Sequence, residues 1–284
     1  MKVDIGNRWV WITGASSGIG AALARAAARS GGRLLLSGRN SEALAAVATE
    51  CEEISRSAGR AGGHETLPFD LLDRAARAAA VQKALALSGG IALLVLNAGI
   101  SQRCRFEDLA PEAFDRIMEL DFNAPVDMIR RMLPSWGGKK GPASGILIVS
   151  SVVGLIAAPR RSAYAAAKHA ITGFSSVLRG ELLDRRIAVT TVFPGYVRTG
   201  IAKAALGADG KPRGLDDPDI SGGADPDRVA RKILDAALAG RAELRVALSL
   251  ESRFALFATR RLPDLYARLM AARGKALAKR ESGN

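Results

Sequence analysis

The sequence of 284 residues is 48% apolar and 24% charged, which fits one globular domain over 1–284 and excludes a disordered or low-complexity chain. Its two cysteines, Cys51 and Cys104, and its two histidines, His64 and His169, match no ligand spacing, so no metal is expected. The net charge is +13, no secretory signal opens the chain, and no apolar run reaches the roughly 18 residues of a membrane span, so we expect a cytoplasmic protein.

Apolar and amphipathic segments alternate along the chain. Short apolar runs predict strands at 8–13, 33–37, 65–69, 91–96, 145–150, 187–193 and 243–248. Longer periodic segments predict helices at 19–30, 41–58, 72–87, 111–133, 163–183 and 226–239. Most of the runs are almost continuously apolar, as in strands covered on both faces. The alternation therefore predicts an α/β fold, a doubly wound parallel sheet of about seven strands with helices on both faces.

A glycine-rich segment joins the first predicted strand to the first predicted helix. Gly14 permits a tight turn, Gly18 lets the backbone approach a pyrophosphate, and Gly20 allows the helix to pack closely on the sheet. The N–H groups and dipole of a helix N-terminus favour a bound anion. The segment predicts a dinucleotide site formed by Thr13, Gly14, Ser16, Ser17, Gly18, Ile19 and Gly20.

The end of the second predicted strand indicates which dinucleotide is bound. An acid at this point excludes a 2′-phosphate on the adenosine ribose, and the stretch Ser37-Gly-Arg-Asn40 contains none. Arg39 offers a planar fork suited to phosphate, and Ser37 can add a hydroxyl. NADP(H) is therefore favoured over NAD(H), the alternative being that Arg39 is an ordinary surface arginine.

Tyr164 and Lys168 lie four residues apart in a predicted helix and so share one face of it. A nearby cation stabilises the phenolate form of a tyrosine. Such a tyrosine can transfer a proton to a ketone oxygen as hydride arrives at the carbon.

These motifs together resemble the short-chain dehydrogenases/reductases, in the form with a Thr-Gly-x-x-x-Gly-x-Gly turn, from about Trp9 to Thr199. The resemblance implies a single Rossmann-type domain that carries its own catalytic residues. It implies that Tyr164 is the proton donor in reduction and that Lys168 assists it and binds the nicotinamide ribose. Ser151, thirteen residues before the tyrosine, is implied to hold the carbonyl, with Ser150 as the neighbouring candidate.

Further positions follow from the same resemblance. Asn123 is implied to order a proton-relay water near the lysine. The remaining positions implied to bind the cofactor are Asp70, Leu71, Asn97, Ala98, Gly99, Pro194, Gly195, Val197 and Thr199. One departure is Leu96, where many members have an asparagine; a leucine at this position suits strand packing.

The substrate side is predicted to be apolar. Val152, Val153 and Tyr196 are expected to border it together with Ser151 and Tyr164, and the Gly-, Pro- and Asp-rich segment 200–225 is a candidate lid. We therefore expect a small-molecule carbonyl or alcohol substrate of hydrophobic, lipid- or steroid-like character.

The C-terminal extension, residues 251–284, is basic and amphipathic. Apolar residues recur there at helical spacing, at Leu262, Leu265, Tyr266, Leu269 and Met270. The extension fits a peripheral membrane contact, packing on a partner subunit or packing on the chain's own core. The family resemblance implies a homodimer or homotetramer through helices 111–133 and 163–183.

Two other functions are open alternatives. A non-catalytic NADP-binding regulatory module is disfavoured by the complete set of Ser151, Tyr164 and Lys168. Binding of nucleic acid is not expected, because no basic patch interleaved with aromatic residues and no helix-turn-helix pattern is present. A nucleotide-sugar isomerase or dehydratase needs a larger C-terminal substrate domain than the residues after Thr199 provide.

Overall fold

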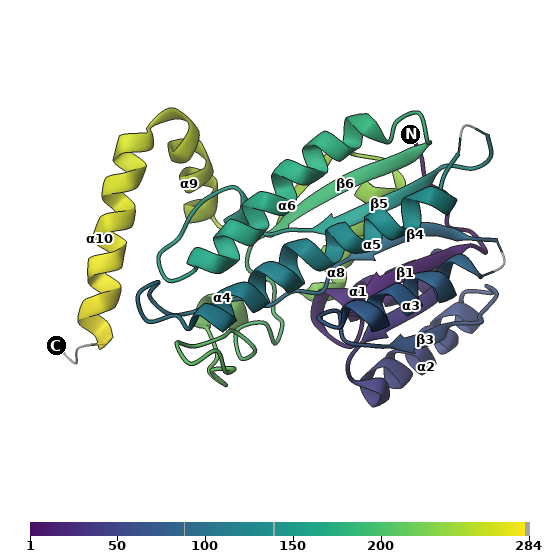
Figure 1. Ribbon diagram of the computed structural model, residues 1–284, viewed down its shortest axis with the longest axis horizontal. Helices are drawn as coiled ribbons and strands as arrows, with labels where there is room; N and C mark the ends of the chain where they lie inside the picture. Colours follow the sequence, from purple (N-terminus) through teal and green to yellow (C-terminus); the bar gives the residue numbers. More distant parts are fainter. Residues whose placement is uncertain (88, 139, 282–284) are drawn as a thin grey trace.

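The computed structural model describes residues 1–87, 89–138 and 140–281, in which a seven-stranded, all-parallel sheet has the order β3-β2-β1-β4-β5-β6-β7 (Figure 1). The strands are β1 (Trp9–Thr13), β2 (Arg33–Gly38), β3 (Glu65–Pro68), β4 (Ile91–Leu96), β5 (Ser144–Val149), β6 (Ile187–Pro194) and β7 (Glu243–Val246). The predicted doubly wound fold is confirmed. Its strand order reverses between β1 and β4, where such sheets bind ligands beyond the carboxyl ends of their strands.

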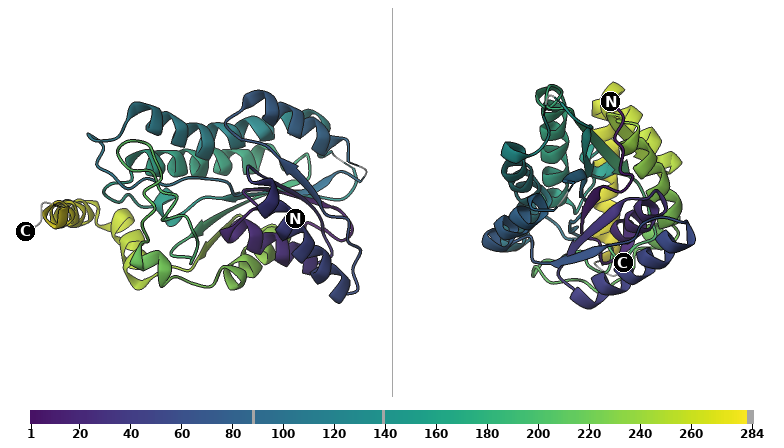
Figure 2. Two further views of the ribbon diagram at one scale, coloured as in Figure 1. Left: turned by 90° about the horizontal axis from the view of Figure 1, so that it is seen from below. Right: turned by 90° about the vertical axis from the view of Figure 1, so that its right-hand side faces the viewer.

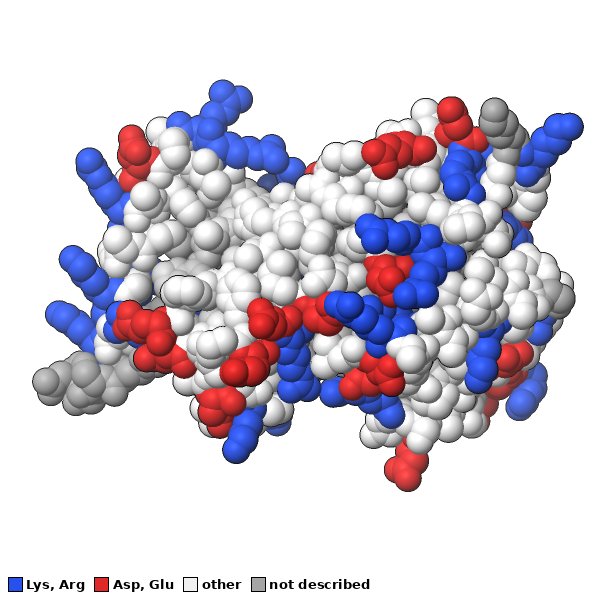
Figure 3. Space-filling model, viewed as in Figure 1, with Lys and Arg blue, Asp and Glu red and all other residues white. Residues whose placement is uncertain are grey.

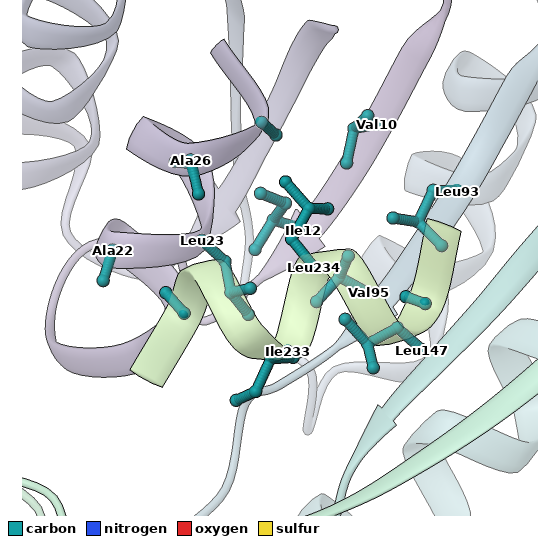
Figure 4. Close-up of a cluster of buried hydrophobic side chains, with 14 of the residues drawn as sticks. Val10, Ile12, Ala22, Leu23, Ala26, Leu93, Val95, Leu147, Ile233 and Leu234 are labelled. Carbon is teal, nitrogen blue, oxygen red and sulfur yellow. The ribbon is translucent and has the colours of Figure 1, made fainter. Parts of the chain in front are cut away.

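The helices cover the two faces of the sheet in two sets (Figure 2). On one face lie α1 (Gly18–Arg29), α2 (Ser41–Ser57) and α8 (Pro226–Leu238), and on the other lie α3 (Arg74–Leu85), α5 (Ala124–Met132) and α6 (Ser162–Glu181). Each set of helices forms a hydrophobic core with one face of the sheet, and alternate residues of β1 point into the two cores. Val10 and Ile12 face the first set of helices, and Trp9 and Trp11 face the second. Figure 4 shows the first core.

The segment 111–133, predicted as one helix, is interrupted. It consists of α4 (Pro111–Met118), a π-helical turn η1 (Glu119–Asn123) and α5, followed by the 3₁₀ turn η2 (Leu133–Ser135). The prediction of a continuous helix is wrong because a π-turn leaves the apolar periodicity on either side largely intact. Such turns are frequent at functional sites, and this one carries an acid, Asp121, into the interior.

The segment after β6 is ordered rather than structureless. It contains the short helix α7 (Pro218–Ser221), and isolated bridges tie Leu206 to Gln102 and to Pro212. Beyond β7 the chain forms an arm of two helices, α9 (Leu250–Arg261) and α10 (Pro263–Glu281), which projects from the body of the molecule (Figures 1 and 2). Within the described ranges, no helix is long and apolar enough to cross a membrane.

Candidate active site

A cavity of about 1160 Å³ lies at the carboxyl ends of the strands. It is lined by residues that follow β1, β2, β4, β5 and β6, and it extends from the glycine-rich turn to the start of α6. Because it lies where the strand order reverses, it occupies the place expected for a dinucleotide crevice. All the residues predicted to bind cofactor or substrate line it except Gly20.

The glycine-rich turn is held in shape by its neighbours. Gly14 and Gly18 have φ angles of 64° and 56°, in the left-handed region that favours glycine. A Cβ at Gly20 would lie 2.1 Å from the carbonyl oxygen of Gly14, so helix α1 can approach the turn only with glycine here. Asn97 Nδ2 donates to the carbonyl oxygens of Thr13 and Gly14, each at 3.1 Å. Asn97 therefore has a structural task beside any contact with cofactor.

The residues predicted to contact the adenosine part of the cofactor differ in how accessible their side chains are. Arg39 is exposed at the rim of the cavity. Ser37 is buried, and its Oγ accepts a hydrogen bond from Trp11 Nε1 at 2.9 Å, which leaves its O–H proton for another acceptor. Asp70 accepts a hydrogen bond from the backbone N–H of Leu72 at 3.0 Å. Arg39 is thus the cationic group at this end of the cavity most accessible to a phosphate.

The catalytic end is formed by α6 and by the turn after β5. Tyr164 and Lys168 lie on α6 and are 5% and 4% exposed. Ser151 follows β5, and its Oγ caps the short helix η3 (Val152–Gly154) by accepting from the N–H of Val153 at 3.2 Å. The hydroxyl of Ser150 instead bonds the carbonyl oxygen of Lys168, at 3.3 Å. Of the two serines, Ser151 is therefore the better candidate for a contact with substrate.

Lys168 is fixed by three groups. Its Nζ lies 5.7 Å from the centre of the Tyr164 ring, donates to the carbonyl oxygen of Val149 at 3.2 Å, and lies 3.1 Å from Oδ2 of Asp121. The Asp121 side chain is fully buried, and its Oδ1 accepts from the N–H of Ile100 at 2.9 Å. Burial opposes the charged lysine, but Asp121 and Tyr164 outweigh it and raise the pKa of Lys168. The lysine is therefore held as a cation beside the phenol.

Asn123, predicted to order a water near the lysine, does not reach the cavity. Its side chain is exposed and donates to Glu119 Oε2 at 3.1 Å. The π-turn directs Asp121 inward in its place, and this residue was missed from the sequence. A signal was present, because Asp121 falls in the series Ile117, Asp121, Ala124, Met128, whose spacing of three and four residues marks a buried helix face.

Comparison with known proteins identifies the family. The family model of short chain dehydrogenases matches residues 8–208. The dehydrogenase/reductase SDR family member 7B of Bos taurus is 36% identical over 282 residues, which cover 97% of this chain and 84% of that protein. The chain belongs to the short-chain dehydrogenase/reductase family. It is an oxidoreductase with a Rossmann-type nucleotide-binding domain.

Two solved structures of short-chain dehydrogenases resemble this fold. The enzyme from Sphingobium yanoikuyae in complex with NADPH has a TM-score of 0.73 and 27% identity, and the match covers 91% of this chain and 95% of that one. A short-chain dehydrogenase/reductase from Burkholderia phymatum in complex with NAD has a TM-score of 0.76 at 24% identity, with 94% and 96% covered.

The cavity of this short-chain dehydrogenase/reductase also has an apolar wall and several arginines. The predicted residues Val152 and Val153 are buried at the wall. The arm adds Phe254, Leu269 and Met270 to it. Five arginines also line the cavity: Arg103, Arg116, Arg161, Arg213 and Arg273. They come from segments far apart in the chain, so the sequence alone does not bring them together. Within the described residues, no group of three His, Cys, Asp or Glu side chains is placed to hold a metal ion.

Proposed function

We propose that the chain is an NADP(H)-dependent oxidoreductase that interconverts a ketone and a secondary alcohol. One observation carries the proposal: Tyr164 and Lys168 are buried on one face of α6, and they line the same cavity as the glycine-rich turn. The cavity volume of about 1160 Å³ suits a dinucleotide with a further small molecule. Gly14, Gly18 and the N-terminus of α1 fit its pyrophosphate.

The proposed chemistry at the reacting oxygen belongs to three side chains. A bound nicotinamide supplies or accepts the hydride. Ser151 and Tyr164 both donate hydrogen bonds to the carbonyl oxygen, where negative charge develops during reduction. Tyr164 then transfers its phenolic proton to that oxygen, and the Lys168 ammonium stabilises the phenolate left behind. The Asp121 carboxylate positions Lys168 without touching the substrate.

The preference for NADP(H) rests on the end of β2. Arg39 is exposed at the rim of the cavity, and no acid follows the strand to repel a 2′-phosphate. Of the two similar structures, the enzyme from Sphingobium yanoikuyae was solved with NADPH and that from Burkholderia phymatum with NAD, so the preference rests on Arg39. Ser37 accepts from Trp11 and can still donate its O–H to a phosphate, so it is retained as a proposed contact.

The substrate is proposed to be hydrophobic over much of its length. Val152, Val153, Phe254 and Met270 offer an apolar wall, and the segment 200–225 borders the cavity as a lid should. The exposed apolar and basic side chains of the arm support a peripheral contact with the cytoplasmic face of a membrane. A homodimer or homotetramer is retained as a proposal from the family.

The proposal is tested by NADPH and NADH oxidation across a library of ketones, with Tyr164→Phe as the matched variant. We expect NADPH to be preferred and the variant to lose about 100- to 10,000-fold in kcat, the usual contribution of a general acid. NADPH binding, followed by its fluorescence, should persist in the variant because the phenol does not hold the cofactor's phosphates. Equal turnover by both proteins contradicts the assignment of Tyr164. Tight NADPH binding without turnover of any ketone favours the regulatory module instead.

A further inference from the structure

Arg161 stands at the catalytic end of the cavity. It is the residue immediately before α6, three positions before Tyr164, and it lines the cavity together with Arg103 and Arg213. Residues three apart in this setting project from the same side of the chain, with side chains roughly 5–6 Å apart. The guanidinium and the phenol are thus directed toward one volume.

The environment of Arg161 is unfavourable for a cation. Burial, and then repulsion by Arg103, lower the pKa of Arg161 to about 10 against the opposing influence of Tyr164, Tyr196 and Asp217. Asp217 is already hydrogen-bonded to Arg103. Among the residues that the structure describes, no hydrogen bond or ion pair of the Arg161 guanidinium is found. A desolvated cation that has no hydrogen bond or ion pair costs stability unless other charges offset it.

The cofactor's phosphates do not account for this cation. The pyrophosphate is expected at the turn from Gly14 to Gly20, and a 2′-phosphate at Arg39, both after the first two strands. Arg161 lies at the other end, beside the proton donor. Another arginine that lines the cavity, Arg116, has a buried Nε that finds no hydrogen-bond acceptor within the described parts of the chain. The positive charge therefore faces the position of the substrate.

We propose that the substrate carries an anionic oxygen group, a carboxylate or a phosphate-type group, which Arg161 binds while the carbonyl lies at Tyr164. The proposal rests on the function proposed above and narrows its substrate class. Arg161 and Tyr164 are three positions apart and line one cavity, so we expect the anion and the ketone to be separated by only a few bonds. The rest of the molecule lies against the apolar wall formed by Val152, Val153 and the arm. The substrate class is thus an oxo acid or oxo phosphate analogue with a hydrocarbon chain.

The test uses matched pairs of ketones with NADPH. 3-Oxooctanoate is compared with its methyl ester, and 2-oxoheptylphosphonate with its dimethyl ester, so that the two pairs distinguish carboxylate from phosphate chemistry. The variants are Arg161→Gln, which removes the charge, and Arg161→Lys, which keeps the charge but loses the planar fork. Arg130→Gln is the matched control, because Arg130 is exposed on α5 and does not line the cavity.

For the wild type we expect a higher kcat/KM with one or both anions than with the corresponding esters. Arg161→Gln should lose about 10- to 100-fold with the anion, the usual effect of removing a charge-assisted hydrogen bond, and little with the ester. Arg161→Lys should fall between the two, and Arg130→Gln should match the wild type. Arg161→Gln should also melt at the same or a higher temperature, because it removes an unpartnered, desolvated charge.

Failure of this proposal is distinguishable from failure of the proposed function. The anion site is wrong if the esters are reduced as fast as both anions, or if Arg161→Gln loses the same factor in kcat/KM on esters and anions. Neither result contradicts the proposed reductase activity. If no ketone is reduced, the proposed reductase activity is wrong, and the anion site is then tested by the binding of octanoate and octanamide. Octanoate should then raise the melting temperature of the NADPH-saturated wild type more than octanamide does, and not that of Arg161→Gln. No difference between octanoate and octanamide overturns the anion site.

Discussion

At the residue scale, the contact of Asp121 with Lys168 joins two buried side chains of opposite charge, 3.1 Å apart. Removing one partner of a buried pair leaves the other charge uncompensated, which costs more than the pair itself contributes. The contact with the N–H of Ile100 orients the carboxylate, so Asp121 fixes both the place and the charge of the lysine. Its effect on catalysis is exerted through Lys168.

Asp121→Asn tests this role, because asparagine keeps an oxygen for the Ile100 N–H and removes the charge. Asp121 helps raise the pKa of Lys168, so its loss lowers this pKa and the lysine loses its proton at lower pH. We expect kcat near neutral pH to fall by up to about 100-fold, and the alkaline limb of the pH–kcat profile to move to lower pH.

The matched control is Asp127→Asn, on the next helical turns, where the carboxylate pairs with Arg77 and Arg131 and does not line the cavity. It should lower stability and leave the alkaline limb in place. A profile of Asp121→Asn that overlays the wild-type profile contradicts the positioning role.

At the scale of elements, the edge of the sheet at β3 depends on one histidine. His64 Nδ1 accepts from the backbone N–H of Leu34 at 3.1 Å, so the neutral ring carries its proton on Nε2, which lies 3.0 Å from Ser55 Oγ. Burial is the main cause that lowers the pKa of His64, in spite of Glu52 nearby. Protonation of Nδ1 removes the acceptor for the N–H of Leu34 and so breaks this hydrogen bond to β2.

The stability of the protein should therefore fall on mild acidification. A histidine whose pKa is lowered by folding binds more protons when unfolded, so stability is retained above about pH 6.5 and lost as the pH falls below it. His64→Ala should lose about 1 kcal/mol at pH 8 and show a flatter decline between pH 7 and pH 5, measured by urea unfolding. His169→Ala, at an exposed position on α6, should keep the wild-type slope. If the free energy of unfolding of His64→Ala declines with falling pH as steeply as that of the wild type, His64 is not the cause of the decline.

Helices whose ends carry capping residues or proline were predicted within a few residues. The helix predicted at 226–239 is α8 (Pro226–Leu238), where Asp225 is the cap and accepts from the N–H of Arg228 at 2.9 Å, and Pro226 lies in the first turn. The π-turn was not predictable in this way, because it changes where Asp121 and Asn123 point without breaking the apolar pattern around them. The environment of Arg161 was also out of reach, since Arg103 and Asp217 approach it from segments distant in the sequence.

At the scale of the whole molecule, the arm of α9 and α10 has two faces. One face packs against the body of the protein beside the cavity, and the other is exposed to solvent. Tyr266 is buried and its hydroxyl donates to the carbonyl oxygen of Ala157, while Met270 packs beside it. Large apolar side chains that do not line the cavity remain exposed at Leu250, Phe257, Leu262 and Leu265. Lys and Arg side chains project from the same arm (Figure 3). The prediction of packing on the chain's own core thus describes one face of the arm, and the other face has the composition of an interfacial helix.

We expect the arm to hold the protein on anionic vesicles. Phe257 and Leu265 are 56% and 43% exposed, so replacing both with serine removes apolar surface without opening the interior. Wild-type protein should co-sediment with vesicles containing phosphatidylserine, less so in 0.5 M salt, because surface charges are then screened. The double variant Phe257→Ser/Leu265→Ser should remain in the supernatant while reducing a short, water-soluble ketone normally. Val177→Ser, at an exposed apolar site on α6, is the matched control and should sediment like the wild type. Equal sedimentation of the double variant and the control would show that the arm does not bind membranes.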